Sequence, residues 1–84
     1  MIEAEALEAR IREGVGDVSH IAVRDLTGTK DHWEALIVSS AFDGKSRIEQ
    51  HQMVYKALGE LMSGPIHALA LQTYTPESWS EVEG

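Results

Sequence analysis

The chain has 84 residues, of which 43% are hydrophobic and 25% are charged, and it contains no cysteine. This length suits one domain with a modest core. Without cysteine the chain has no disulfide, no thiol nucleophile and no thiolate metal ligand, so any metal is held by His, Asp or Glu or by a partner's thiolates. Fourteen acidic residues oppose seven basic ones, and the net charge of −7 disfavours general nucleic-acid binding.

The first residues are acidic and lack the basic segment and apolar run of a secretory signal. No apolar stretch approaches the ~20 residues of a membrane span. We therefore expect a cytoplasmic protein, or the mature stromal or matrix form of an imported one.

The first half of the chain predicts a helix followed by a hairpin. Residues 2–13 place apolar side chains at helical spacing, and the glycines that follow end the helix. Residues 19–26 and 33–40 read as strands, and the second has the denser apolar run of a central strand. The turn-like break at 27–31 joins them as an antiparallel hairpin.

The second half predicts a helix, a strand and a short last helix. Ser46 stands three residues before Glu49, as in a capping box, and the helix it opens carries apolar residues up to Met62. Residues 66–74 read as the third strand. Thr-Pro at 75–76 supplies an N-cap and a first helical residue for the last helix.

The predicted order is α-β-β-α-β-α. The second strand, the helix and the third strand form a βαβ unit, which makes those two strands parallel if both lie in one sheet. The expected fold is α/β of the α+β kind, with a three-stranded mixed sheet and helices packed on one face.

Two histidines are expected at one edge of this sheet. His32 immediately precedes the second strand, and His67 opens the third. Parallel neighbours start at the same edge and lie ~4.8 Å apart, so two imidazoles there would reach one metal centre beside Asp31. A single histidine at a strand end is more often an ordinary polar residue at the solvent boundary. Two ligands are also too few for a self-sufficient structural zinc site.

Several segments resemble the BolA-like family. They are Phe-Asp-Gly-Lys-Ser at 42–46, Gln-His-Gln-Met-Val-Tyr at 50–55, the run from Ile66 to Trp79, and Asp-His-Trp at 31–33. The resemblance covers essentially the whole chain and implies a single BolA-like domain over residues 1–84, with an ordered core of about 2–80 and a short acidic C-terminal tail. It also implies a fold similar to a class II KH domain, with the order αββαβα.

The resemblance further implies a non-enzymatic partner of monothiol glutaredoxin that acts in iron–sulfur cluster handling and iron homeostasis. In the pair a [2Fe–2S] cluster bridges the two proteins. The glutaredoxin thiolate and glutathione supply sulfur, and His67 and His32 here match the positions that supply nitrogen. Imidazole in place of thiolate raises the potential, as in Rieske centres. Cluster affinity should drop as pH falls through ~6.5, where free imidazole protonates.

The alternative function is a KH-like DNA-binding transcriptional regulator. Lys45, Arg47 and His51 are the residues that would contact nucleic acid or a partner. Many family members have Arg-His-Arg where this chain has Gln-His-Gln at 50–52, which weakens that reading. The spacing of the remaining polar residues indicates no catalytic arrangement, so we expect no enzyme. Trp33 and Trp79 are read as packing anchors, and His20 has no partner that the sequence indicates.

Overall fold

The computed structural model describes residues 3–28, 32–64, 66 and 68–83. The predicted order αββαβα is confirmed, and none of the helices in those ranges is long and apolar enough to cross a membrane. The elements are α1 (Ala4–Val15), β1 (Val18–Asp25), β2 (His32–Ser39), the 3-10 helix η1 (Ser40–Phe42), α2 (Arg47–Leu58), the 3-10 helix η2 (Gly59–Ser63), β3 (Ala68–Tyr74) and α3 (Pro76–Glu83).

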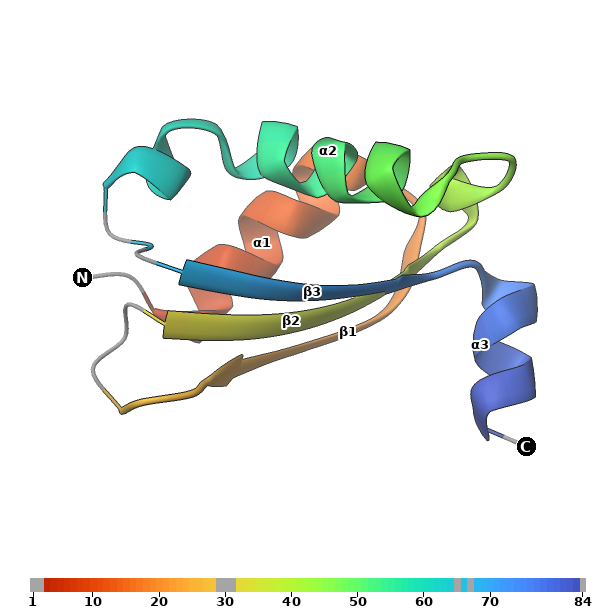
Figure 1. Cartoon of the computed structure of the whole chain (residues 1–84), viewed down its shortest axis with the longest axis horizontal. Helices are drawn as coiled ribbons and strands as arrows, with labels where there is room; N and C mark the ends of the chain where they lie inside the picture. The colour runs from red at the N-terminus through yellow and green to blue at the C-terminus, as the bar shows by residue number, and fades with distance from the viewer. Residues whose placement is uncertain (1–2, 29–31, 65, 67, 84) are drawn as a thin grey trace.

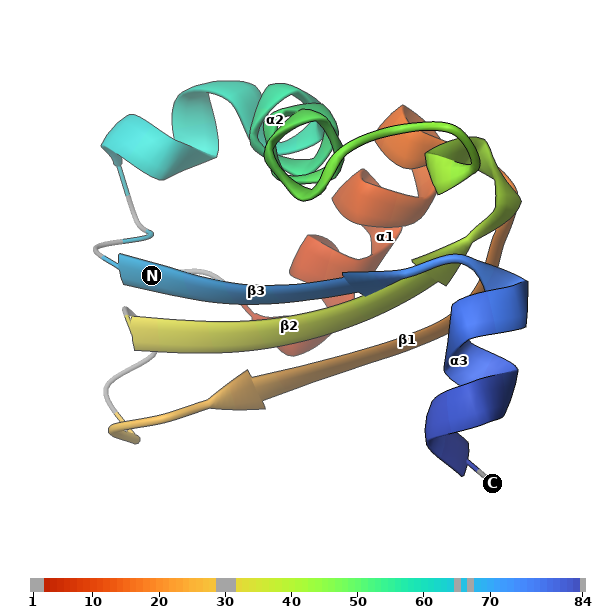
Figure 2. The same cartoon turned by 45° about the vertical axis from the view of Figure 1, so that its right-hand side comes forward.

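The sheet is mixed and has the strand order β1-β2-β3. The β1–β2 hairpin is antiparallel, and β2 runs parallel to β3, as predicted. The two long helices α1 and α2 cover one face of the sheet (Figure 1). The short α3 leaves the end of β3 and extends toward the side away from α2 (Figure 2).

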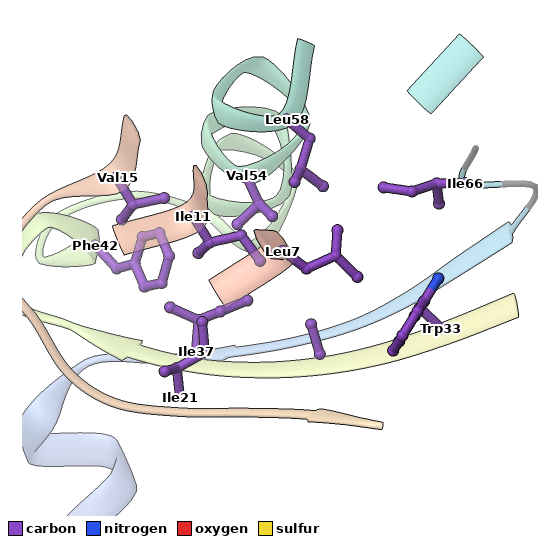
Figure 3. Packing of buried hydrophobic residues seen from close by; sticks show 11 residues of the cluster. Leu7, Ile11, Val15, Ile21, Trp33, Ile37, Phe42, Val54, Leu58 and Ile66 are labelled. Atoms are coloured by element: carbon purple, nitrogen blue, oxygen red, sulfur yellow. The ribbon is translucent and has the colours of Figure 1, made fainter. Parts of the chain in front are cut away.

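The core lies between the sheet and the two long helices (Figure 3). Alternate residues of β2 point toward the helices because successive side chains of a strand face opposite ways. The helices contribute apolar residues at 3–4 spacing, and the 3-10 turn after β2 contributes an aromatic ring. The most deeply buried members are Leu7 and Ile11 of α1, Trp33, Ala35 and Ile37 of β2, Phe42 of η1, Val54 and Leu58 of α2, and Ile66.

The opposite face of the sheet, which we call the reverse face, carries the other set of alternating residues. The strand register aligns His20, Val38 and Tyr74 in one row across it, and His32 with Ala68 in another. Most residues of the reverse face are exposed or half-buried, but Val38 is buried and only 1% exposed. Because α1 and α2 cover the other face, Val38 is covered by the short α3.

The ends of α2 follow from local chemistry. The hydroxyl of Ser46 accepts from the Glu49 N–H (3.2 Å), and the Glu49 carboxylate accepts from the Ser46 N–H (2.8 Å), which is the predicted capping box. These hydrogen bonds lower the pKa of Glu49 below its ordinary value. The regular helix ends at Leu58 rather than running to Met62, because Gly59 takes a positive φ of 54° and a 3-10 helix follows.

The first helix also ends later than the sequence predicted. α1 continues through Gly14 to Val15, and the chain turns at Gly16, whose φ is 81°. Gly14 is therefore a helical residue and not the helix terminator. Its place in the helix is explained by α2, since a methyl group added there would lie 2.7 Å from the Cα of Ala57.

Candidate metal-ligand edge of the sheet

The starts of β2 and β3 lie at the same edge of the sheet, at the left of Figure 1. His32 is the register partner of Ala68 in this parallel pair. The predicted ligand His67 lies outside the described residues. Its chain neighbours are described: Ile66 is buried in the core at 1% exposure, and Ala68 is exposed. At this edge the structure therefore describes His32 and the residues on either side of His67.

His32 is the first residue of β2 and not, as predicted, the last residue before it. It alternates with the buried Trp33, so its side chain belongs to the reverse face and is half-buried. Its backbone carbonyl accepts a hydrogen bond from the Leu26 N–H at 2.8 Å, which closes the hairpin loop. The Asp25 carboxylate organises the start of that loop by accepting from the N–H groups of Thr27 and Gly28.

Within the described ranges, no group of three or more His, Cys, Asp or Glu side chains is placed to hold a metal ion. Asp31, which the sequence placed beside His32, falls outside those ranges, as does the segment 29–31. Among the described residues, the imidazole donor at this edge is that of His32. One imidazole is too few ligands to hold a metal ion by itself.

The basic residues proposed for nucleic-acid or partner contact lie elsewhere. Lys45 and Arg47 are exposed at the start of α2, and His51 is half-buried one turn further on. In Figures 1 and 2 the start of α2 lies toward the end of the sheet opposite the starts of β2 and β3. The structure therefore does not bring these residues together with His32, and the chain carries two separate candidate surfaces.

Gln50 has a structural role at the start of α2 that the sequence did not indicate. Its side-chain amide donates to the carbonyls of Lys45 (3.0 Å) and Phe42 (3.4 Å), and its oxygen accepts from the Thr73 hydroxyl of β3 (2.6 Å). One side chain thus joins the loop before α2 to the sheet. This gives a physical reason for a neutral amide at this position of the Gln-His-Gln segment.

We expect Gln50→Ala to lower the free energy of unfolding by about 1–2 kcal/mol, because it leaves partly buried carbonyls and a hydroxyl without their partner. Urea unfolding followed by circular dichroism measures the loss. Gln52→Ala is the matched control, since Gln52 is exposed on the same helix. Equal losses in the free energy of unfolding from the two substitutions would contradict the bridging role of Gln50.

His20, which the sequence left without a partner, stacks on Trp79 of α3. Their ring centroids are 5.4 Å apart and the rings are inclined by 16°. Tyr74 at the end of β3 contacts the same indole at 5.3 Å and 52°. Alternation in β1 placed His20 on the reverse face, but no local pattern in the sequence says that a helix more than fifty residues later returns to it.

Comparison with known proteins gives a consistent result. The model of the BolA-like protein family matches residues 5–78. BolA-like protein 1 of Mus musculus is 44% identical over 54 residues, which are 64% of this chain and 39% of that protein. The DNA-binding transcriptional regulator BolA of Escherichia coli is 38% identical over 56 residues, or 67% of this chain and 53% of that protein. The chain thus spans about half or less of these relatives' lengths.

The fold comparison agrees with the sequence comparison. The structure of a BolA protein homologue from Coxiella burnetii superposes with a TM-score of 0.82 at 31% sequence identity. The match covers 95% of this chain and 99% of that one. The family model and the shared αββαβα fold lead to one conclusion: the chain belongs to the BolA-like family.

Proposed function

We propose that this chain is a non-enzymatic partner of a monothiol glutaredoxin and contributes His67 and His32 as nitrogen ligands to a bridging [2Fe–2S] cluster. The observation that carries the proposal is the parallel register of His32 with Ala68, the residue next to His67. It supports a pair of imidazoles at one sheet edge, because parallel strands start together and lie ~4.8 Å apart.

The chemistry of the chain supports this division of ligands. With no cysteine, the chain has no thiolates with which to hold an iron–sulfur cluster by itself. It has imidazoles to add to a cluster that a partner already holds through sulfur. The chain's own residues would bind one iron and set its electronic environment. The partner protein and glutathione would supply the sulfur ligands.

The test is reconstitution of this protein with a monothiol glutaredoxin, glutathione, iron and sulfide. We expect visible circular dichroism bands that differ from those of the glutaredoxin cluster, and we expect His67→Ala to restore the spectrum of glutaredoxin by itself. His32→Ala should alter the bands less, since His67 is the principal ligand. His20→Phe, at the opposite end of the sheet from His32, is the control and should leave them unchanged. A spectrum that is unaffected by His67→Ala would refute the proposal.

A second candidate function is DNA binding, which the name of the Escherichia coli relative states for that protein. The exposed Lys45 and Arg47 at the start of α2 favour it. The net charge of −7 and the engagement of Gln50 with backbone carbonyls oppose it. Fluorescence anisotropy with duplex DNA at two salt concentrations separates the cases. Tight binding with a steep salt dependence, lost in Lys45→Glu/Arg47→Glu, would favour this function over the first.

A further inference from the structure

The last helix is held to the rest of the molecule by very little. α3 has eight residues and no fully buried side chain, and Val82 on it is 57% exposed. Glu81 and Glu83 stand in its last turn, where the helix dipole disfavours negative charge. A helix this short is not stable by itself in water. Its position therefore depends on the contact that Trp79 makes with the reverse face.

That contact consists of one indole between two rings on the sheet. Trp79 stacks on His20 of β1 and tilts against Tyr74 of β3, and Val38 lies between them in the same row. The local cap adds a second restraint, since the hydroxyl of Thr75 accepts from the Ser78 N–H (3.1 Å). The cap fixes the start of α3 but does not reach the sheet, whereas the stack on His20 does.

We propose that His20 and Trp79 form a proton-sensitive clasp that docks α3 more firmly at low pH. An imidazolium is attracted to the face of an indole by the ring quadrupole, in addition to the stacking that neutral imidazole provides. The neutral imidazole lacks this attraction, so docking of α3 is stronger when His20 carries a proton and weakens when the proton is lost. Opening exposes Val38 and Tyr74, at the end of the sheet opposite His32, so the inference does not depend on the proposed cluster.

The charged groups near His20 are also compatible with an imidazolium beneath α3. Among the described residues no carboxylate pairs with its imidazole, and Arg24 on the same strand is paired with Glu34 at 3.1 Å. The three glutamates of α3 are opposite in charge to an imidazolium on the face that this helix covers. The sheet and α3 form the surroundings of His20, and their other titratable and charged groups are Glu77, Glu81 and Glu83 on α3, His32 and Glu34 on β2, Tyr74 on β3, and Arg24 and Asp25 on β1.

Amide hydrogen exchange of the intact protein tests the clasp. The reporter is the Trp79 N–H, which donates to the Thr75 carbonyl at 2.9 Å. Its protection factor, corrected for the intrinsic exchange rate at each pH, should fall about two- to fivefold between pH 5.5 and pH 7.5. His20→Phe keeps a stacked ring without a titrating proton, so its protection factor should not change with pH. His51→Gln, on the other side of the sheet, should behave like the unaltered protein.

Two results would overturn the clasp. One is a protection factor of Trp79 that stays constant over this pH range in the unaltered protein. The other is a pH dependence that persists in His20→Phe, which would assign the effect to another group. A fall that is present in the unaltered protein and in His51→Gln but absent in His20→Phe is the outcome that the proposal requires.

Discussion

Gly14→Ala is expected to lower the free energy of unfolding by about 2 kcal/mol, although alanine is the better helix former. The substitution places a methyl group 2.7 Å from the Cα of Ala57 and closer still to its Cβ. Both atoms belong to the packed helix α2, so α1 and α2 must move apart to admit the new group. An exposed helical glycine without such a neighbour would instead gain about 1 kcal/mol on replacement by alanine.

Urea unfolding of the unaltered protein, Gly14→Ala, Ala57→Gly and the double variant tests this close approach. In an Ala57→Gly background, Gly14→Ala should lower the free energy of unfolding by less, because the nearest methyl group is gone. Some loss should remain, because the Cα of residue 57 is still close. Glu13→Ala is the control, since Glu13 is the exposed neighbour of Gly14 on the same helix. We expect it to change stability by less than about 0.5 kcal/mol. A stabilising Gly14→Ala, or one equally costly in both backgrounds, would contradict the packing of α1 on α2.

Ser39→Ala should lower the free energy of unfolding by about 2 kcal/mol, which is the second large effect that we expect. Ser39 is a fully buried polar residue at the end of β2. Its hydroxyl donates to the Gly16 carbonyl at 2.6 Å and accepts from the Ala41 N–H at 3.0 Å. It thereby joins the turn after α1 to the start of η1. Alanine leaves both backbone groups without this partner beside a fully buried position, and buried groups without a partner carry their desolvation cost.

The neighbouring Ser40 provides the matched comparison for Ser39. Ser40 is exposed, so Ser40→Ala removes the same hydroxyl group from solvent-facing backbone and should change stability by less than about 0.5 kcal/mol. Chemical denaturation of both variants at neutral pH gives the two values directly. If Ser39→Ala proved as mild as Ser40→Ala, the buried hydroxyl would not be what links the turn to the sheet.

Periodicity and capping chemistry predicted most of this fold because they act locally. The helical spacing in residues 2–13 and the Ser46–Glu49 box each specify structure within a few residues. The βαβ connection then predicted that β2 and β3 run parallel within one sheet, which the structure confirms. Errors arose where a distant contact decides the outcome. Gly14 was taken as a helix end because glycine usually is one, whereas here Ala57 on another helix requires it.

The candidate site was predictable only up to the edge of the sheet. The starts of β2 and β3 were placed together by topology, and the register of His32 with Ala68 agrees with that placement. Residue patterns give no sign of which molecule completes the proposed ligand set, since in the proposal the thiolates come from another protein. They likewise give no sign of the stack between His20 and Trp79, because long-range ring contacts depend on how α3 returns to the sheet.

The central claim is that imidazole nitrogen from this chain binds a shared [2Fe–2S] cluster. Pulsed electron paramagnetic resonance of the reduced cluster tests it most directly, with ¹⁵N-histidine in this chain and an unlabelled monothiol glutaredoxin. The proposal predicts strong ¹⁵N hyperfine couplings of directly bound nitrogen, and predicts that they are lost in His67→Ala. A reduced cluster in the complex without ¹⁵N couplings from this chain would contradict the proposed function.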